Sequence, residues 1–340
     1  NEGPFVVQYR GRYYLIYNAN HTSPRYGNYA LGVAEAESPL GFSNGEKYPF
    51  PVLRSSRDAR YVGLEPDTGY PEVKNCGQPN LVRGPNGIEW WLVYFADRTH
   101  RSQYIDRVHF FGRELFVEGP TTADTAGYHP GPALPSFRDC FEENGPVTEQ
   151  WDVTGAWVKE AGSLCSRGGA GLVSALARVM PSRHYVLEAT LGLKETTSGR
   201  CGVLAWDNGR DSRLLVGLDR EKTAVFATLY RGNDSEEELK ILPAGFHWEG
   251  PHVLRIENNA GFFRMYLDAV LLNLKKDALE DFGPGRAGIF VEGCRASFES
   301  FGWTRGWDEW ASGIHGWQNT EGTLLAGHAE GIRLDAGQSA

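Results

Sequence analysis

The sequence lacks the features that would assign it quickly to several large classes of protein. No apolar run approaches the roughly 18 residues of a membrane-spanning helix. No long block of Lys and Arg is present, and 34 basic against 43 acidic residues give a net charge of −9. Neither a membrane nor a nucleic acid is therefore an expected partner.

Cysteine is scarce, and its spacing does not match the common metal-binding patterns. None of the five cysteines forms a C-x-x-C pair or a Cys/His cluster with metal-ligand spacing. We expect no metal at these residues, and we expect free, mostly buried thiols in a reducing compartment. One or two long-range disulfides remain a second interpretation. The cysteines are Cys76, Cys140, Cys165, Cys201 and Cys294.

An initiating methionine is also missing, because position 1 is Asn. We therefore expect this chain to be a piece of a longer protein or a processed one. No signal peptide is visible, but without a true start its absence says little. The compartment stays open between the cytoplasm and the exterior of the cell.

Glycine, proline and aromatic residues are what the sequence has in quantity. The chain contains 42 Gly and 18 Pro, and 12% of its residues are aromatic. Strands favour aromatic side chains, and turns favour Gly and Pro, so this composition predicts an all-β protein. A hydrophobic content of 41% is enough for a packed core and argues against disorder over most of the chain.

Two hairpins in the first third of the chain repeat each other. Residues 4–7 align with residues 79–82 at an offset of 75, and residues 13–19 align with residues 90–96 at an offset of 77. The alignment places Gly77 opposite Glu2 and Gln78 opposite Gly3. Repeated antiparallel units are typical of a β-propeller or a stack of hairpins. We predict the last blades of a propeller over residues 1–122.

A Pro-rich linker is predicted over residues 123–136, followed by an antiparallel β-sandwich over residues 137–304. We interpret the acidic run at residues 234–238 as a solvated turn between strands. A pattern built on Trp157 and Gly162 recurs 160 residues later, at Trp317 and Gly322. Residues 305–340 are therefore predicted to begin a second, truncated sandwich. The candidate strands of the first sandwich are 185–193, 202–207, 214–218, 224–230, 252–258, 262–267, 287–291 and 297–303.

Several motifs of the first 122 residues occur in a specific order. They are Glu2-Gly3-Pro4, Tyr13-Tyr14-Leu15, the small-residue stretch 29–34, Ser38-Pro39-Leu40-Gly41, Gly77-Gln78-Pro79-Asn80, Trp90-Trp91, the stretch led by Arg101, and Gly119-Pro120. In this order they resemble glycoside hydrolase family 43, the five-bladed propeller glycosidases. The sandwich is similar to the laminin-G or concanavalin-like (jelly-roll) modules appended to many glycosidases.

The resemblance implies a catalytic role for Glu2, the general acid of an inverting glycosidase. Such an enzyme needs one protonated carboxyl for the leaving oxygen and an ionised carboxylate about 6.5–9.5 Å away to activate water. The family's base Asp and orienting Asp lie on blades that precede Glu2, so we expect this chain alone to be inactive. The expected partner is an oligo- or polysaccharide, by default an arabinofuranoside or xyloside.

Substrate contacts are expected at the blade starts and on the loops of the same face. Gln78 stands where the family often has a His that helps to hold a central water or metal ion. Gln is a poorer metal ligand, so a central structural cation is doubtful and no cofactor is expected. In the first blade the rim loop offers His21, Arg25 and Tyr26, and in the second it offers Arg101, the preferred contact. Each rim residue could instead only stabilise its loop.

Two other functions remain open at this stage. The first is a non-catalytic carbohydrate-binding protein that acts through the sandwich, and the second is a propeller used only as an interaction scaffold. Five tryptophans of the sandwich are expected mostly in its core, although one or two could stack on sugar. They are Trp151, Trp157, Trp206, Trp248 and Trp303.

Overall fold

A computed structural model places most of the chain in two compact units. The first is built on Asn1–Ala133 and the second on Leu134–Asp308. The structure describes residues 2–22, 29–56, 72–111, 113–121, 131–142, 147–168, 171–193, 198–248, 250–275, 277–306, 325–328 and 331–334.

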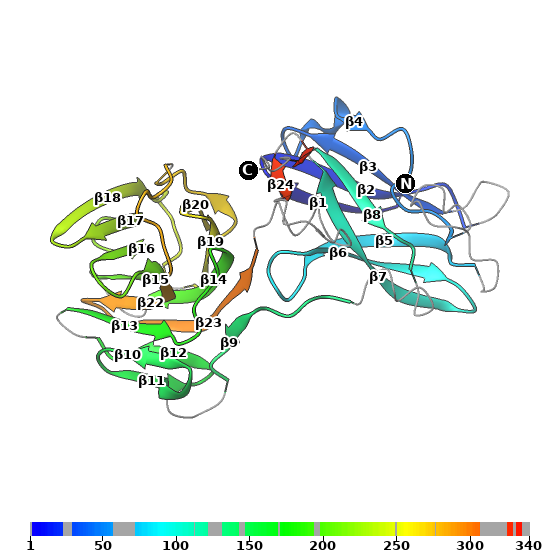
Figure 1. The fold of residues 1–340 in the computed structure, drawn as a ribbon. Coiled ribbons are helices and arrows are strands. Elements are labelled where there is room, and N and C mark those ends of the chain that lie inside the picture. Colours follow the sequence, from blue (N-terminus) through cyan, green and yellow to red (C-terminus); the bar gives the residue numbers. More distant parts are fainter. Residues whose placement is uncertain are drawn as a thin grey trace, which may run out of the picture. The chain divides into compact units, whose positions relative to one another are not determined.

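The first unit contains two four-stranded antiparallel sheets, each with its strands in sequence order (Figure 1). This meander is the arrangement of a propeller blade, as predicted. The strands of the first sheet are β1 (Glu2–Tyr9), β2 (Arg12–Ala19), β3 (Ala30–Ala36) and β4 (Glu46–Lys47). The strands of the second sheet are β5 (Lys74–Arg83), β6 (Trp90–Asp97), β7 (Arg101–Phe111) and β8 (Glu114–Glu118).

Alternating side chains and a tight turn explain the first hairpin. Arg10 and Gly11 connect β1 to β2, and both have positive φ, 48° and 79°. Two consecutive positive φ values are the signature of the two-residue turn that matches the twist of paired strands. Along β1, alternate residues from Phe5 to Tyr9 turn toward the core while their neighbours stay exposed.

Aromatic rings fill the core between the two blade sheets. The Tyr9 ring stacks on Phe110 with centroids 4.1 Å apart and meets Trp90 edge-on at 5.9 Å. Tyr14 meets Phe110 at 5.2 Å. Edge-on and stacked pairs of this kind add to the free energy of burial itself. The two sheets are thus joined by one continuous apolar cluster.

The second unit is a sandwich of a seven-stranded and an eight-stranded sheet, with one large core between them (Figure 1). The seven-stranded sheet has the order β10 (Trp151–Val153), β13 (Leu172–Ala177), β22 (Arg286–Glu292), β15 (Arg200–Asp207), β16 (Ser212–Asp219), β17 (Ala224–Arg231) and β18 (Asp234–Ile241). The eight-stranded sheet contains β11 (Trp157–Glu160), β12 (Ser163–Ser166), β23 (Ala296–Arg305), β14 (His184–Leu193), β19 (His252–Asn259), β20 (Phe262–Leu267), β21 (Val270–Leu271) and β9 (Phe137–Asp139).

Most tryptophans of the sandwich lie in its core, as predicted from the sequence. Trp151, Trp206 and Trp303 are at most 2% exposed and belong to the core, and Trp157 and Trp248 pack against it half-buried. All five cysteines are free thiols, and all but Cys140 are buried. A further hairpin joins β24 (Leu325–His328) to β25 (Gly331–Leu334).

The acidic run at residues 234–238 was predicted wrongly as a turn. It forms most of β18, an edge strand paired along its length with β17. Its side chains are almost all exposed, and Glu237 pairs with Arg200 and Lys222. Charges on an edge strand are a common device against edge-to-edge aggregation, so an acidic run is compatible with a strand at this position.

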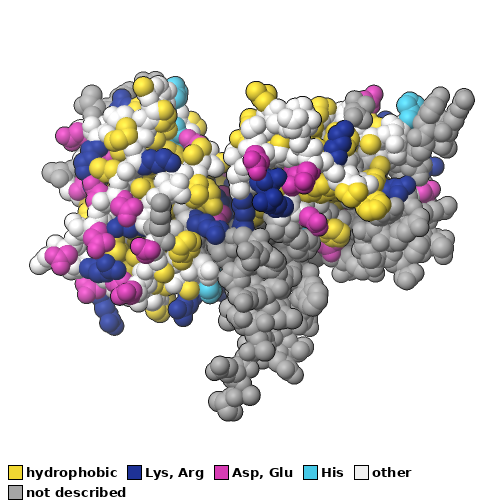
Figure 2. All heavy atoms as spheres, turned by 90° about the horizontal axis from the view of Figure 1, so that it is seen from above, with side chains coloured by type: hydrophobic (Ala, Val, Ile, Leu, Met, Phe, Trp, Pro, Cys, Tyr) yellow, Lys and Arg dark blue, Asp and Glu magenta, His cyan; other side chains and the backbone are white. Residues whose placement is uncertain are grey.

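Charges of both signs intermingle on the face of the sandwich seen in Figure 2. No helix among the described residues is long and apolar enough to cross a membrane. The predicted linker and the predicted second sandwich after residue 305 fall largely outside the described residues, so those boundaries stay predictions.

Candidate functional site

The same irregularity opens the first strand of each blade. The pairing of β1 with β2 shifts register between Glu2 and Phe5, and that of β5 with β6 shifts on both sides of Gly77. Bulges of this type bend a strand and redirect its side chains. The structure therefore confirms the sequence repeat at the level of backbone geometry, with Glu2 and Gly77 at equivalent places.

Gly3 and Gln78 occupy equivalent positions and share one backbone conformation. Both have φ near +53°. This left-handed region suits Gly and is strained for Gln by roughly 1–2 kcal/mol. The Gln78 side chain lies against Gly3, because a Cβ added there would fall 3.0 Å from Gln78 Oε1. The two blade starts are therefore in direct contact.

Tyr29 holds the carboxylate of Glu2. Its hydroxyl donates to Glu2 Oε2 at 2.6 Å. Tyr29 is buried, and both burial and the hydrogen bond to Glu2 raise the pKa of its phenol. A hydroxyl that stays protonated donates permanently, so one oxygen of Glu2 is engaged and the orientation of the carboxyl is restrained.

Tyr29 itself is positioned by the second blade. Its ring stacks on Phe95 with centroids 6.2 Å apart. A Cβ added to Gly77 would fall only 2.5 Å from Tyr29 Cε1, so the ring fits here because residue 77 has no side chain. The fully buried Asn18 links the blades as well, because its Oδ1 accepts a hydrogen bond from the backbone N–H of Gln78 at 3.1 Å.

Arg101 also packs on the Phe95 ring. Its guanidinium carbon lies 4.4 Å above the Phe95 ring, and its Nε pairs with Asp97 Oδ1 at 2.9 Å. The hydrogen bond from Arg101 holds the pKa of Asp97 below its usual value, and a bond from Asn75 acts in the same direction. The positive charge of Arg101 also acts to lower the pKa of Tyr29, against the larger effects of burial and of the hydrogen bond to Glu2.

A cavity of about 390 Å³ opens beside Glu2 on the first blade. This volume lies within the range that accommodates small ligands. Its wall combines one carboxylate, one ammonium group and aromatic rings. The lining residues are Glu2, Pro4, Leu15, Tyr17, Ala34, Phe42, Ser43 and Lys47.

Three of the six predicted site residues converge. Glu2, Gln78 and Arg101 are connected through Gly3, Tyr29 and Phe95, as described above. His21 lies exposed, two residues beyond the end of β2. The predicted contacts Arg25 and Tyr26 lie outside the described residues.

Sequence reasoning missed the roles of Tyr29 and Asn18. Tyr29 was noted only as the first residue of a small-residue strand. Asn18 carried a usable signal, because it is a polar residue at an inward position of an otherwise apolar strand, where a buried amide needs a specific partner.

The described residues offer no cluster of three or more His, Cys, Asp or Glu side chains suited to hold a metal ion. Gln78, at the position where the resembled family often has a His, offers only an amide. Residue 78 therefore supplies no imidazole ligand for a central cation.

Comparison with known proteins locates the resemblance in the first unit. The sequence model of glycosyl hydrolases family 43 matches residues 1–122. None of the curated proteins compared matches this chain.

Three solved structures illustrate what the chain is similar to. A xylan β-1,4-xylosidase from Bacillus halodurans C-125 is 18% identical over 89% of this chain and 65% of its own, with a TM-score of 0.39. The carbohydrate binding module CBM66 from Bacillus subtilis is 18% identical over 46% of this chain and 95% of its own, with a TM-score of 0.39. A thermostable family-43 glycoside hydrolase is 32% identical over 39% of this chain and 38% of its own, with a TM-score of 0.30.

The xylosidase and a further family-43 structure each match 89% of this chain. The chain spans about 65% of the length of those two proteins. The match of the family model covers the bulged blade starts and the Glu2 site. The resemblance of residues 1–122 to glycosyl hydrolases family 43 is therefore confirmed.

Proposed function

We propose that this chain is part of a glycoside hydrolase in which Glu2 is the general acid. The observation that carries the proposal is the placement of Glu2. It lies at the bulged start of a blade strand, beside a cavity, with one oxygen held by the buried Tyr29. The match of residues 1–122 to the family model supports the same assignment.

The geometry suggests how the proton is delivered. Because Glu2 Oε2 accepts the hydroxyl hydrogen of Tyr29, Oε1 is the oxygen that carries the transferable proton. Glu2 would donate that proton to the oxygen of the departing sugar as the glycosidic bond breaks. Tyr29 acts as a positioning residue, since it touches the acid and not the reacting atoms.

Inversion requires a second carboxylate on the opposite side of the bond, about 6.5–9.5 Å from the acid, to activate a water molecule. We propose that this base and an orienting Asp belong to blades outside this chain. The present chain alone would then bind sugar without hydrolysing it.

The proposed substrates are plant-polysaccharide pentosides such as arabinofuranosides or xylosides. Gln78 and Arg101 are proposed to contact sugar hydroxyls, because an amide and a guanidinium fork both donate hydrogen bonds in defined directions. His21, Arg25 and Tyr26 are proposed as rim contacts on the loop that follows β2.

Substrates with poor and good leaving groups test the role of Glu2 as the general acid. In the full-length protein, Glu2→Gln should abolish hydrolysis of xylo-oligosaccharides, whose leaving groups need a proton. Activated aryl glycosides, which leave without protonation, should retain much more of their rate. Glu46→Gln, at an exposed carboxylate of β4, is the matched control and should change neither rate. Equal losses on both substrates would contradict the assignment.

A second test addresses Tyr29. Tyr29→Phe keeps the ring that packs on Phe95 but removes the hydrogen bond to Glu2. We expect kcat on oligosaccharides to fall about tenfold with KM little changed, because the acid loses its orientation rather than its substrate. An increase in KM with an unchanged kcat would assign Tyr29 to substrate binding instead.

The alternative is a non-catalytic protein that binds carbohydrate through the sandwich. Two blade starts that carry Asp in the full-length sequence would support the enzyme. Their absence, together with no hydrolysis by the full-length protein, would support the alternative.

A further inference from the structure

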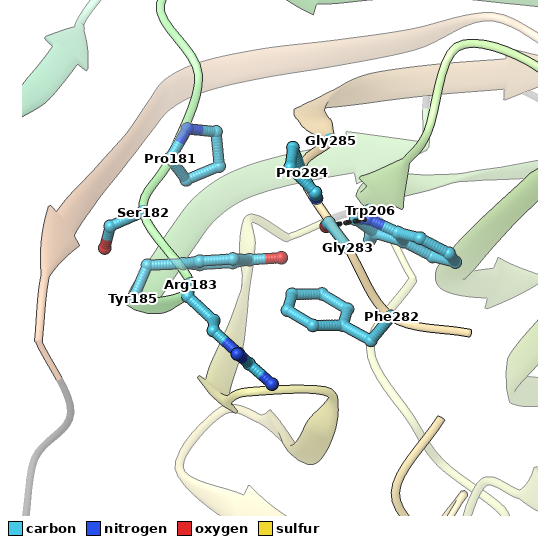
Figure 3. A pocket seen from close by; sticks show the side chains of 9 residues that line it. All are labelled: Pro181, Ser182, Arg183, Tyr185, Trp206, Phe282, Gly283, Pro284 and Gly285. Carbon is cyan, nitrogen blue, oxygen red and sulfur yellow. Dashed lines mark hydrogen bonds between the residues drawn. The ribbon is translucent and has the colours of Figure 1, made fainter. Parts of the chain in front are cut away.

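A second cavity lies at one end of the sandwich, in the other unit of the chain. Its volume is about 410 Å³, within the range of small-molecule sites. It is enclosed by the approach to β14, the end of β15 and the segment that leads into β22 (Figure 3). The lining residues are Pro181, Ser182, Arg183, Tyr185, Trp206, Phe282, Gly283, Pro284 and Gly285.

The aromatic walls have their own polar atoms satisfied within the protein. The Tyr185 hydroxyl donates to the carbonyl of Ala205, and Trp206 Nε1 donates to the carbonyl of Gly283 at 3.0 Å, drawn as a dashed line in Figure 3. Burial raises the pKa of Tyr185, so its hydroxyl remains neutral. The polar atoms of these two buried rings are therefore unavailable to a ligand, and the half-buried Phe282 is the ring that can offer aromatic carbon to the cavity.

The walls are also rigid. Tyr185 and Trp206 are at most 2% exposed, and Phe282 packs against Trp206 with ring centroids 5.4 Å apart. A Cβ added to Gly285 would fall 2.4 Å from Trp206, so this backbone approaches the indole as closely as only Gly allows. A ligand would enter a preformed space, which lowers the entropy lost on binding.

Arg183 is the one lining residue with a formal charge. Its backbone is fixed, because its carbonyl accepts hydrogen bonds from Ala260 N and Asn258 Nδ2, both at 3.1 Å. Its exposed guanidinium makes no hydrogen bond or ion pair with any residue that the structure describes. Figure 3 shows the side chain extending past the Tyr185 ring toward Phe282. The neighbouring Asp281 is engaged by Arg231 instead, at 3.1 Å.

We propose that this cavity binds a sugar ring that carries a carboxylate, such as a uronic acid residue of a polysaccharide. Aromatic carbon suits the C–H face of a sugar ring, and a guanidinium fork suits a carboxylate in bidentate geometry. The residues that line the cavity place both beside one space large enough for a ring. The proposal is independent of the glycosidase assignment, because the cavity and Glu2 lie in different units.

Two sugars that differ only in the carboxylate test the proposal directly. Methyl glucuronide and methyl glucoside are titrated into the intact chain, and binding is measured by calorimetry. We expect the glucuronide to bind at least about tenfold more tightly, as a charge-assisted hydrogen bond predicts. Its binding should also weaken as salt is added, while that of the glucoside should not.

Substitution of the arginine locates the site. Arg183→Gln should reduce the affinity for the glucuronide to that for the glucoside. Arg295→Gln is the matched control, because Arg295 is also exposed but follows the opposite end of β22. It should leave both affinities unchanged. Phe282→Ala should weaken both sugars, and the thermal melting curve of each variant reports whether it is folded.

Several outcomes would overturn the proposal. These are no binding of the glucuronide, equal binding of the two sugars, or equal losses in the two arginine variants. The last result would show attraction by the general charge of the surface rather than recognition in the cavity.

Discussion

The strand that carries Glu2 and the central strands of the sandwich are held in place in different ways. Strand β1 alternates between exposed and half-buried residues, and only Tyr9 is buried. In β17, by contrast, six consecutive residues from Ala224 to Leu229 are buried. Side chains on both faces of this strand are buried, one set in the main core and Phe226 in a small cluster formed with neighbouring strands, whereas the outward face of β1 stays open.

This contrast indicates where each unit is vulnerable. The sandwich is stabilised by apolar packing, so its stability should respond to changes of volume in the core. The Glu2 strand depends on a few specific features, namely a bulge, a left-handed residue and a hydrogen bond to Tyr29. Substitutions in this strand should alter the orientation of the Glu2 carboxyl and the pKa of Tyr29 more than the free energy of unfolding.

The largest expected difference is in folding alone. Residues 134–308 should unfold in a single cooperative transition, because their strands are buried within the unit. Residues 1–133 should melt broadly, since among the described residues the core that joins their two sheets is smaller than the core of the sandwich. Calorimetry of the two pieces measures this. Sharp melting of both would remove the contrast, and a broad transition of 134–308 would refute the proposed boundary.

Truncation of Trp151 tests packing in the sandwich. Trp151→Ala should lower the free energy of unfolding by about 3–5 kcal/mol, because a fully buried ring leaves a cavity. It also leaves Asp139 without the indole hydrogen bond at 2.9 Å. Trp157→Ala is the control, since that ring is only half-buried, and should cost about 1 kcal/mol. Denaturant unfolding measures both, and similar losses would contradict the packing argument.

Backbone conformation at the blade starts should matter next. Gly3→Ala should destabilise the chain by about 1–2 kcal/mol, since φ is +53° and Gln78 occupies the space beside it. Gln78→Gly should have the opposite effect and stabilise by up to about 1 kcal/mol. Thermal unfolding of the two variants checks the sign. A stabilising Gly3→Ala would show that the left-handed turn is wrong.

The contact between Glu2 and Tyr29 can be followed by the pKa of the tyrosine. Glu2→Gln should lower the pKa of Tyr29, because the carboxylate is one of the causes that raise it. The pKa should stay above the ordinary value, since burial is the larger cause and remains. Titration of ring-labelled tyrosine by NMR measures the shift. An unchanged pKa would mean that the hydrogen bond does not form in solution.

The smallest effect is expected at low pH and should be shared by the two units. The pKa of Asp97 is lowered chiefly by Arg101, and that of Asp281 chiefly by Arg231. Each pair stabilises the fold above the unfolded pKa of about 4, and this contribution is lost as the pH falls through the lower folded value. Asp97→Asn and Asp281→Asn should each flatten the decline in stability below about pH 4. Acid unfolding curves identical to that of the unchanged chain would contradict both ion pairs.

Local patterns were sufficient for much of the fold. The repeat of residues 4–7 and 13–19 at residues 79–82 and 90–96 predicted the two hairpins and their equivalent blade starts. The acidic run at 234–238 was misread, because composition cannot distinguish a solvated turn from a solvated edge strand. The run forms a strand because β17 lies beside it and supplies backbone hydrogen bonds, and that neighbour is decided by the order of strands in the sheet.

The sequence by itself determined the all-β class, the repeated blades, the tryptophan core of the sandwich and the nomination of Glu2, Gln78 and Arg101. These follow from periodicity, composition and motif order, which are local along the chain. Only the tertiary structure decided that Tyr29 holds Glu2 and that Tyr29 also packs on Phe95. It also decided that Arg183 shares a cavity with Phe282. The contacts of Tyr29 with Glu2 and Phe95, and of Arg183 with the cavity that Phe282 lines, join residues from 27 to about 100 positions apart. Which side chains meet over such separations depends on the packing of sheets rather than on any local preference.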